Sequence, residues 1–272
     1  MHMAATYNHM DAVVVLAEGG AGVNTRANNG VTPLYTAAQG GHVTLMHRLI
    51  ALGAHADTHR NNGCSSLYVA ASNGHVDMVN ALAQMGVSVN MPASDGATPL
   101  YAAAVSDRVE MISALVKLGA DPNIPKCDGT TPMFIAAQNC FLGVIKALAK
   151  AGADVNVPAH NGASPVFIAA QKGHSAAIKL LYRLGADMKP SDTPHSLTEV
   201  AAMWNQSGTV SRIEKILNKM TSECEACGTS SKRLMKCSKC EKVRYCSREC
   251  QVKDFKKHKK ECKAVQKTTT TT

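Results

Sequence analysis

The sequence predicts a mainly α-helical protein, in which a solenoid of repeated helix pairs is followed by a small module held together by metal ions. Two observations lead to this fold class. Glycines and alanine pairs recur every 33 residues through residues 1–220, and seven cysteines and one histidine then follow in a single spaced run. Aromatic residues make up only 4% of the chain, which suits closely packed short helices better than two packed sheets.

The repeat contains two series of glycines. One lies in Asn-Gly or Asp-Gly pairs, which supply the positive φ angles of a tight hairpin turn. The other lies where the second helix of each unit has to end, the usual place for a left-handed residue. The first series is Gly30, Gly63, Gly96, Gly129 and Gly162, and the second is Gly20, Gly53, Gly86, Gly119, Gly152 and Gly185.

Each unit also carries the signals of two helices. A threonine or serine, as at Thr32, caps the first helix by accepting a backbone N–H, and the proline that follows loses no needed hydrogen bond. An alanine pair, as at Ala37 and Ala38, lets neighbouring helices approach closely. Apolar residues at helical spacing, as at Ile112 and Leu115, give the second helix one apolar face. No single unit can bury that face, so stacking of units makes the core.

The 33-residue period and the pattern T-P-L-x-x-A-A of residues 32–38 are similar to the ankyrin repeat. The resemblance implies an ankyrin-repeat α-solenoid of about six units, whose hairpin tips and inner helices line a binding surface for another protein. Each unit places one aromatic residue on the inner helix, and we expect these residues to pack between repeats, with a contact surface as the alternative. They are Tyr35, Tyr68, Tyr101, Phe134 and Phe167.

Histidines recur after a glycine at one position of the repeat, at His42, His75 and His174. Because they keep step with the fold, we expect a structural role and not a catalytic one. Cys140 and Phe141 replace this Gly-His pair in the fifth unit. The replacement predicts either a local shift of the loop or a special contact.

The two ends of the solenoid depart from the pattern. Residues 1–24 align with residues 34–57 but lack the turn and the Thr-Pro start. We therefore expect a short first helix and an uncovered stacking face, with either more repeats upstream or a frayed end. Residues 189–220 are expected to form a degenerate C-terminal cap, with capping boxes at Ser196-x-x-Glu199 and Ser211-x-x-Glu214. The solenoid is thus predicted to span residues 1–220, with a short linker to the next module.

The run of cysteines that follows is enough for two closed tetrahedral zinc sites, because each structural zinc takes four Cys or His ligands. Two Cys-x2-Cys pairs each present two thiolates to one ion, and the last four ligands form two pairs spaced four apart, on one helix face. A closed site holds a shape and turns over no substrate. The eight ligands are Cys224, Cys227, Cys237, Cys240, Cys246, Cys250, His258 and Cys262.

Two other interpretations of this run are less consistent with the sequence. A disulfide framework would need a secreted chain, and the first four residues begin no signal segment. A RING-type ubiquitin ligase would have Cys-x-His in the middle of the run, where this chain has Cys237-x2-Cys240.

Residues 245–258, YCSRECQVKDFKKH, resemble the MYND zinc finger, whose signature is YCS-x-x-CQ-x-x-DW-x-x-H. The resemblance implies a finger at 221–264, before a Thr-rich tail at 265–272. It further implies that Gln251 and Phe255 help line a groove for proline-rich peptides, with Phe255 in place of the usual tryptophan; alternatively, Phe255 is only the small core of the module. It also implies two interleaved zinc sites: Cys224, Cys227, Cys246 and Cys250 would hold the first ion, and Cys237, Cys240, His258 and Cys262 the second.

Charge is concentrated in the finger. Residues 222–272 hold 14 Lys or Arg against 6 Asp or Glu, a net charge of +8, whereas the whole chain has a net charge of +9. Seven bound thiolates and two zinc ions would lower the finger's net charge to about +5. This excess permits weak, salt-sensitive contact with nucleic acid, but a solvated basic face explains it equally well.

Together these features predict an intracellular adaptor in which the solenoid docks one protein and the finger another. The scattered Cys64, Cys127 and Cys140 indicate free thiols in the cytoplasm or nucleus, and no apolar run approaches a membrane span. The alternative is a transcription- or chromatin-associated regulator whose finger contacts nucleic acid. MYND fingers also accompany methyltransferase domains, but repeats account for the residues before the finger, so we expect no enzyme.

Overall fold

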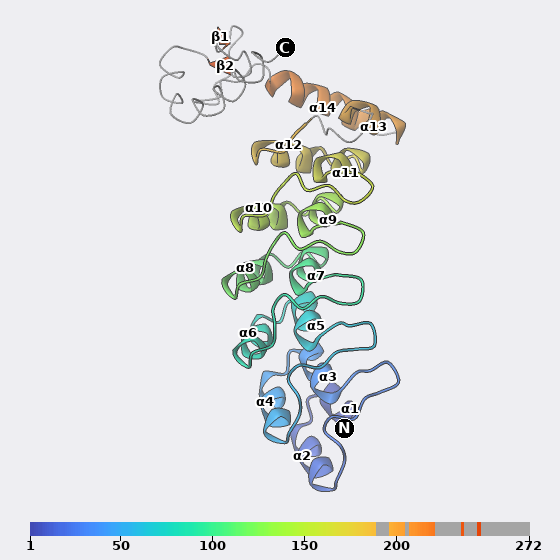
Figure 1. The fold of residues 1–272 in the computed structure, drawn as a ribbon, viewed down its shortest axis with the longest axis vertical. Coiled ribbons are helices and arrows are strands. Elements are labelled where there is room, and N and C mark those ends of the chain that lie inside the picture. Colours follow the sequence, from blue (N-terminus) through green and yellow to red (C-terminus); the bar gives the residue numbers. More distant parts are fainter. Residues whose placement is uncertain (189–195, 205–206, 221–234, 237–243, 246–272) are drawn as a thin grey trace, which may run out of the picture. The chain divides into compact units, whose positions relative to one another are not determined.

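The computed structural model describes residues 1–188, 196–204, 207–220, 235–236 and 244–245 (Figure 1). The chain divides into two compact parts, Met1–Gln206 and Ser207–Thr272. The first part contains the repeats, and the second part contains one long helix and a short pair of strands. The predicted domain boundary at residue 220 stays a prediction.

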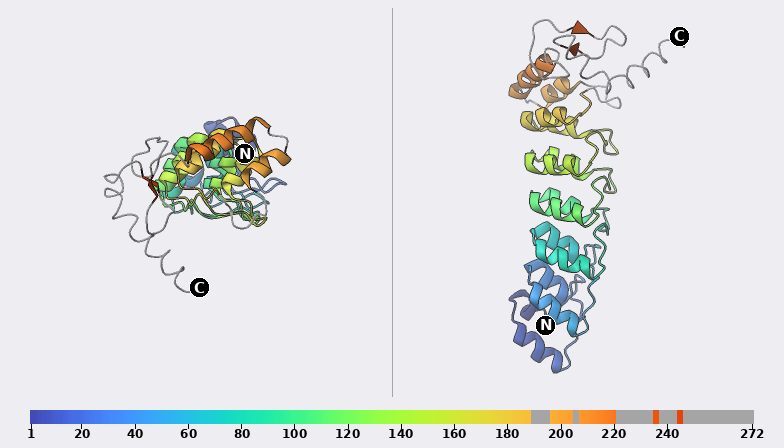
Figure 2. Two further views of the ribbon diagram at one scale, coloured as in Figure 1. Left: turned by 90° about the horizontal axis from the view of Figure 1, so that it is seen from above. Right: turned by 90° about the vertical axis from the view of Figure 1, so that its left-hand side faces the viewer.

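The repeat part, Met1–Gln206, is a column of helix pairs, as predicted. Figure 1 shows the first helix of each pair stacked along one side of the column and the second helix along the other, and Figure 2 shows the same column from two further directions. The first helices are α1 (His2–Thr6), α3 (Pro33–Gly40), α5 (Ser66–Asn73), α7 (Pro99–Val105), α9 (Pro132–Gln138) and α11 (Pro165–Gln171). The second helices are α2 (Met10–Glu18), α4 (Val43–Ala51), α6 (Val76–Gln84), α8 (Val109–Lys117), α10 (Leu142–Lys150) and α12 (Ser175–Arg183).

The predicted caps of the first helices are confirmed. In α3 the Thr32 hydroxyl accepts the backbone N–H of Tyr35 at 3.1 Å, and Ser65 caps α5 in the same way through Tyr68 at 3.0 Å. The cap residues are buried, so each hydroxyl satisfies a donor that water cannot reach.

The hairpin turns confirm half of the prediction. The glycine of each pair has a positive φ, as at Gly96 (82°), but the Asn or Asp before it does not. Its side chain instead accepts the N–H two residues on, as in Asp95 Oδ1 to Ala97 N at 3.1 Å. This is a three-residue hairpin loop with the glycine in the left-handed position. A side chain at Gly96 would also collide with the backbone N of Cys127 in the next hairpin, at 2.8 Å.

The second helices end as predicted. In α4, the N–H of Gly53 donates to the carbonyl of Ile50 at 2.9 Å and the N–H of Ala54 to that of Leu49 at 2.9 Å. This pair of bonds is the Schellman ending, which requires a left-handed residue, and Gly53 has a φ of 91°.

The core forms where units stack. One leucine per unit is fully buried at the same repeat position, at Leu49, Leu82, Leu115, Leu148 and Leu181. The equivalent Leu16 of the first unit remains 39% exposed, and α1 has only five residues. The uncovered stacking face and the short first helix are therefore as predicted.

Asparagine side chains also link neighbouring units, a feature that was not predicted from the sequence. Asn90 donates to the carbonyl of Gly119 at 3.1 Å and accepts the N–H of Asp121 at 3.0 Å. Asn24, Asn123 and Asn156 make the equivalent pairs of bonds. Asp57 holds this position in the second unit, and its carboxylate instead lies 3.2 Å from His59 Nε2.

The last helices confirm one of the two predicted capping boxes. Ser196 caps α13 (Leu197–Met203) reciprocally with Glu199. The box at Ser211 is wrong, because Ser211 lies inside α14 (Ser207–Met220) and not at its start. The apolar series that includes Ile213 begins one turn earlier, at Val210, and the same S-x-x-E spacing also places two side chains on one face of a continuous helix.

The described strands of Ser207–Thr272 are β1 (Met235–Lys236) and β2 (Arg244–Tyr245). They pair antiparallel, with Met235 opposite Tyr245 and Lys236 opposite Arg244.

Candidate interaction surfaces

The inner helices present the row of aromatic side chains predicted from the sequence. Tyr35, Tyr101 and Phe134 are only 4%, 8% and 4% exposed, and Tyr68 and Phe167 are half-buried. Packing between repeats is therefore their main role. Burial raises the pKa of Tyr68 to about 12, so its hydroxyl stays a neutral hydrogen-bonding group at physiological pH.

Cationic side chains from alternate hairpins lie against this aromatic row. The ammonium of Lys126 is 5.5 Å from the centre of the Tyr101 ring and 3.1 Å from Asp95 Oδ2. Arg60 holds the equivalent hairpin position two units earlier, and its charge partly offsets the rise in the pKa of Tyr35 that burial causes. The other three hairpins carry alanine at the equivalent position, at Ala27, Ala93 and Ala159.

Neighbouring groups shift the pKa values of two charged side chains on this surface. Partial burial alone would raise the pKa of Asp95, but the Ala97 N–H and the Lys126 ammonium outweigh it and hold that pKa below its ordinary value. Burial would lower the pKa of Lys126, yet Asp95 and Tyr101 raise it. Both groups are therefore charged near neutral pH and available for polar contacts with a protein partner.

The opposite ends of the helices, at the turns between the two helices of a unit, carry the recurring histidines. His75 Nε2 lies 3.0 Å from the carbonyl of Gln39, and His174 Nε2 lies 2.9 Å from that of Gln138. His42 makes the equivalent contact to Thr6 at 3.4 Å. The predicted structural role is confirmed, because each ring joins two units.

Two units depart from this pattern. In the fourth unit Arg108 replaces histidine and donates through Nε to the Ser72 carbonyl at 3.4 Å. In the fifth, Phe141 offers no donor. The predicted shift of the loop is wrong, because Cys140 keeps the left-handed φ (58°) of the glycines it replaces, and Phe141 keeps the backbone angles of His75.

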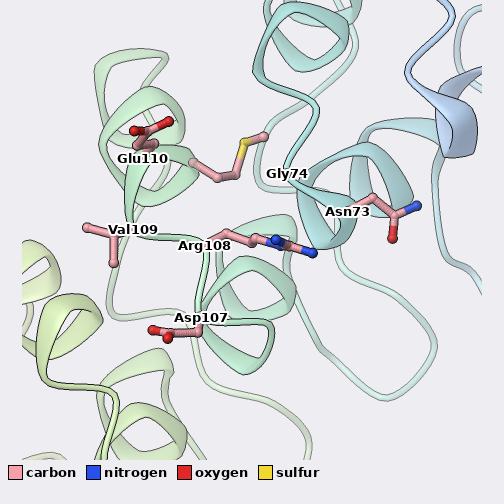
Figure 3. Close-up of a pocket in the computed structure, with 7 residues that line it drawn as sticks. Asn73, Gly74, Asp107, Arg108, Val109 and Glu110 are labelled. Carbon is pink, nitrogen blue, oxygen red and sulfur yellow. The ribbon is translucent and has the colours of Figure 1, made fainter.

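A surface pocket of about 330 Å³ lies beside Arg108. Figure 3 shows Arg108 extended toward Gly74 and Asn73, while Asp107, Val109 and Glu110 point away from it. The pocket therefore joins the third and fourth units at the turns, away from the hairpins.

The predicted zinc ligands and the predicted groove residues Gln251 and Phe255 lie outside the described residues. β1 ends directly before Cys237 and β2 directly before Cys246. In the part of the chain that the structure describes, no group of three His, Cys, Asp or Glu side chains is placed to hold a metal ion. No helix within those residues is long and apolar enough to cross a membrane.

Comparison with known proteins identifies both parts. The model of the family described as ankyrin repeats matches residues 1–93, 44–126, 88–159 and 124–192, and the MYND finger model matches residues 224–262. Ankyrin repeats and MYND fingers mediate interactions between proteins, and MYND-type fingers bind zinc.

Short stretches of the chain are also similar to much longer proteins. SET domain-containing protein 14 of Caenorhabditis elegans is 50% identical over 48 residues, which are 18% of this chain and 11% of that protein. N-lysine methyltransferase SMYD2-B of Danio rerio is 50% identical over 42 residues, 15% of this chain and 10% of that protein. Ubiquitin carboxyl-terminal hydrolase 19 of Arabidopsis thaliana is 47% identical over 49 residues, 18% of this chain and 7% of that protein.

This chain therefore spans about a tenth or less of the length of the curated relatives it matches. The family match, in contrast, runs through most of the chain and follows the observed helix pairs. The chain belongs to the ankyrin-repeat family and carries a MYND-type zinc finger after its repeats.

Proposed function

We propose that the chain is an intracellular adaptor that joins two proteins and catalyses no reaction, with its repeats docking one partner and its finger the other. The observation that carries this proposal is the presence of two protein-interaction folds in one chain. Joining two weak binding sites raises the local concentration of one partner at the other, without any new contact. The free thiols of Cys64, Cys127 and Cys140 support the cytoplasm or the nucleus as its location.

The test uses two variants of the full chain. Replacing Arg60 and Lys126 by alanine removes the hairpin cations, and replacing Cys224 and Cys227 by serine removes two ligands of the finger. We expect affinity capture with the first variant to lose one set of partners and with the second variant to lose another. One shared set lost from both variants would contradict two-site docking.

We further propose that the finger holds two zinc ions in interleaved sites. Seven thiolates and one imidazole are the ligands that structural zinc prefers, and eight ligands satisfy two tetrahedral ions. The antiparallel pairing of β1 and β2 adds support, because Cys237 and Cys246 follow opposite ends of this ribbon in the sequence and are assigned to different ions. The zinc would hold the finger in shape for binding.

Metal analysis checks this stoichiometry. We expect two zinc ions per chain, and one per chain when Cys237 and Cys240 are both replaced by serine, because the first site keeps its four ligands. A Cys64→Ser variant, outside the finger, should keep both ions and serves as the control. A wild-type chain with one ion or none would contradict the eight-ligand assignment.

Gln251 and Phe255 are proposed to contact proline-rich peptides. Phenylalanine retains an apolar platform but lacks the indole N–H donor of the tryptophan usual in this finger. We therefore expect the Phe255→Trp variant to bind a proline-rich peptide more tightly and Phe255→Ala to lose binding, as measured by calorimetry with a proline-free peptide of equal length as control. Unchanged binding in Phe255→Ala would contradict the groove.

A second candidate is contact with nucleic acid, favoured by the net charge of +8 on residues 222–272. Binding to phosphates would weaken steeply as salt rises. If the full chain bound duplex DNA near micromolar at physiological salt and ignored proline-rich peptides, the adaptor proposal for the finger would fail.

A further inference from the structure

The repeats can be compared with one another position by position. The junction between the fourth and fifth units differs from the other junctions at two positions. At the position of Val105, the other units carry polar residues, namely Thr6, Gln39, Ser72, Gln138 and Gln171. At the position of Phe141, they carry His9, His42, His75, Arg108 and His174. Both changes replace a polar residue with an apolar one, and both fall at the turns of the fourth and fifth units.

Both changes fall at the place where the turn of one unit bonds to the carbonyl of the preceding unit. In four other junctions a side-chain nitrogen reaches the carbonyl 36 residues earlier, as His174 reaches Gln138 at 2.9 Å. Phe141 has no donor for the equivalent carbonyl of Val105. Yet the apolar side chains do not bury one another completely, since Val105 is 42% and Val109 38% exposed. A purely structural exchange of a hydrogen bond for packing would hide them.

Exposed carboxylates flank this apolar surface. Asp107 and Glu110 are both exposed, and neither forms an ion pair among the described residues. Arg108, which follows Asp107 in the sequence, is directed toward Gly74 and donates to the Ser72 carbonyl (Figure 3). The local charge is therefore negative and uncompensated on the side of Val109.

Asp107 also occupies a costly backbone position. Its φ is 54°, where three of the other units have Gly41, Gly74 and Gly173 and two have Asn8 (57°) and Cys140 (58°). A left-handed conformation costs an L-residue about 1–2 kcal/mol, although Asp tolerates it better than most. Asp107 therefore adds a carboxylate to this surface at a conformational cost that the glycines of three other units avoid.

We propose that this surface docks a protein segment that carries a basic side chain beside an aliphatic or aromatic one. The basic group faces Asp107 and Glu110, the apolar group covers the two valines, and a backbone N–H of the segment meets the Val105 carbonyl. We name the surface the junction patch: Val105, Asp107, Val109, Glu110, Phe141 and Leu142. It lies at the opposite ends of the helices from the hairpins and outside the finger, so it does not depend on either proposed docking site.

The test is a selection of peptides against the full chain. A phage-displayed library of random twelve-residue peptides is enriched on the wild type after depletion on a variant that combines Val105→Gln with Phe141→His. That variant restores the polar residues of the other units. It is expected to melt at or above the wild-type temperature, because the imidazole introduced by Phe141→His regains the bond to the carbonyl of residue 105. We expect the enriched peptides to share a Lys or Arg next to an apolar residue.

The affinity of one enriched peptide then separates the two parts of the patch. We expect Val105→Gln with Phe141→His to weaken binding on the order of tenfold or more, and the isosteric Asp107→Asn with Glu110→Gln to weaken it similarly. Arg60→Ala with Lys126→Ala, on the hairpins, should leave it unchanged. No patch-dependent enrichment, an acidic consensus, or self-association of the chain abolished by the same substitutions would overturn the proposal.

Discussion

The repeats and the finger differ in what holds them together. In the repeats, each unit is stabilised by its neighbours, through fully buried side chains such as Leu115 and through side chains such as Asn90 that bond across the junction. The finger model matches only 39 residues, too few for such a core, and we propose that bound zinc holds this part together instead. The difference teaches that one chain contains a part whose stability is local and additive and a part whose stability depends on its metal.

The strongest test of this difference is removal of zinc. Structural zinc contributes on the order of 10–16 kcal/mol to small metal-held modules, so chelation should unfold the finger completely. The repeats contain none of the predicted ligands and should keep their helical circular dichroism and melting temperature. Loss of the helical signal from the repeats on chelation would show that the two parts fold together.

Within the repeats, two leucines at the same repeat position give a sharper test. Leu115→Ala should lower the free energy of unfolding by about 2–5 kcal/mol, because it leaves a cavity between two units. Leu16→Ala should cost clearly less, because Leu16 is already 39% exposed. Urea unfolding followed by circular dichroism measures both. Equal costs would mean that burial between units does not set the stability of the column.

The turns between paired helices allow a test in which two substitutions have opposite signs. Cys140→Gly should stabilise the chain by about 0.5–1 kcal/mol, since it relieves a left-handed φ at some cost in unfolded-state entropy. Gly74→Ala should destabilise it by about 1–2 kcal/mol, because Gly74 has a φ of 86° and a new side chain would also press on Arg108. Thermal melts compare the two, and a stabilising Gly74→Ala would refute the backbone explanation.

The smallest effect concerns pH. The pKa of Asp95 is lower in the folded chain, so its contribution to stability is present above the unfolded pKa and is lost as pH falls through the folded pKa. Because the carboxylate is 58% exposed, we expect less than about 1 kcal/mol. Asp95→Asn should flatten the stability profile below pH 4 while Asp57→Asn serves as the control, and an unchanged profile would contradict the assignment.

The fold could be predicted from the sequence to the extent that backbone geometry was encoded by single residues. Gly53 and Thr32 act within their own unit, so their residue type and spacing were sufficient. The Asn90 bridges were missed because a polar residue in a loop resembles a solvated one until its neighbour is placed. The 33-residue recurrence of asparagine was the signal that could have found them.

The interaction sites were less predictable for a related reason. The aromatic row was visible because it repeats, whereas Val105 matters only as an exception to a polar position. A search for what repeats passes over such an exception. The Ser211 error has the opposite origin, since a short motif was interpreted without the longer apolar series that places it inside α14.

The side chain of Asp57 has a consequence for how the column opens. Each asparagine equivalent to Asn90 bonds to residues 29 and 31 positions later, so it joins its own unit to the next one. A carboxylate cannot donate to the carbonyl that asparagine would reach, so the second and third units lack this pair of bonds. The bond that Asn73 donates to the Gln39 carbonyl at 2.8 Å joins them at the opposite ends of their helices. Opening events should start at this joint, and amide protons of residues 1–57 should exchange with solvent together, ahead of those in the middle of the column.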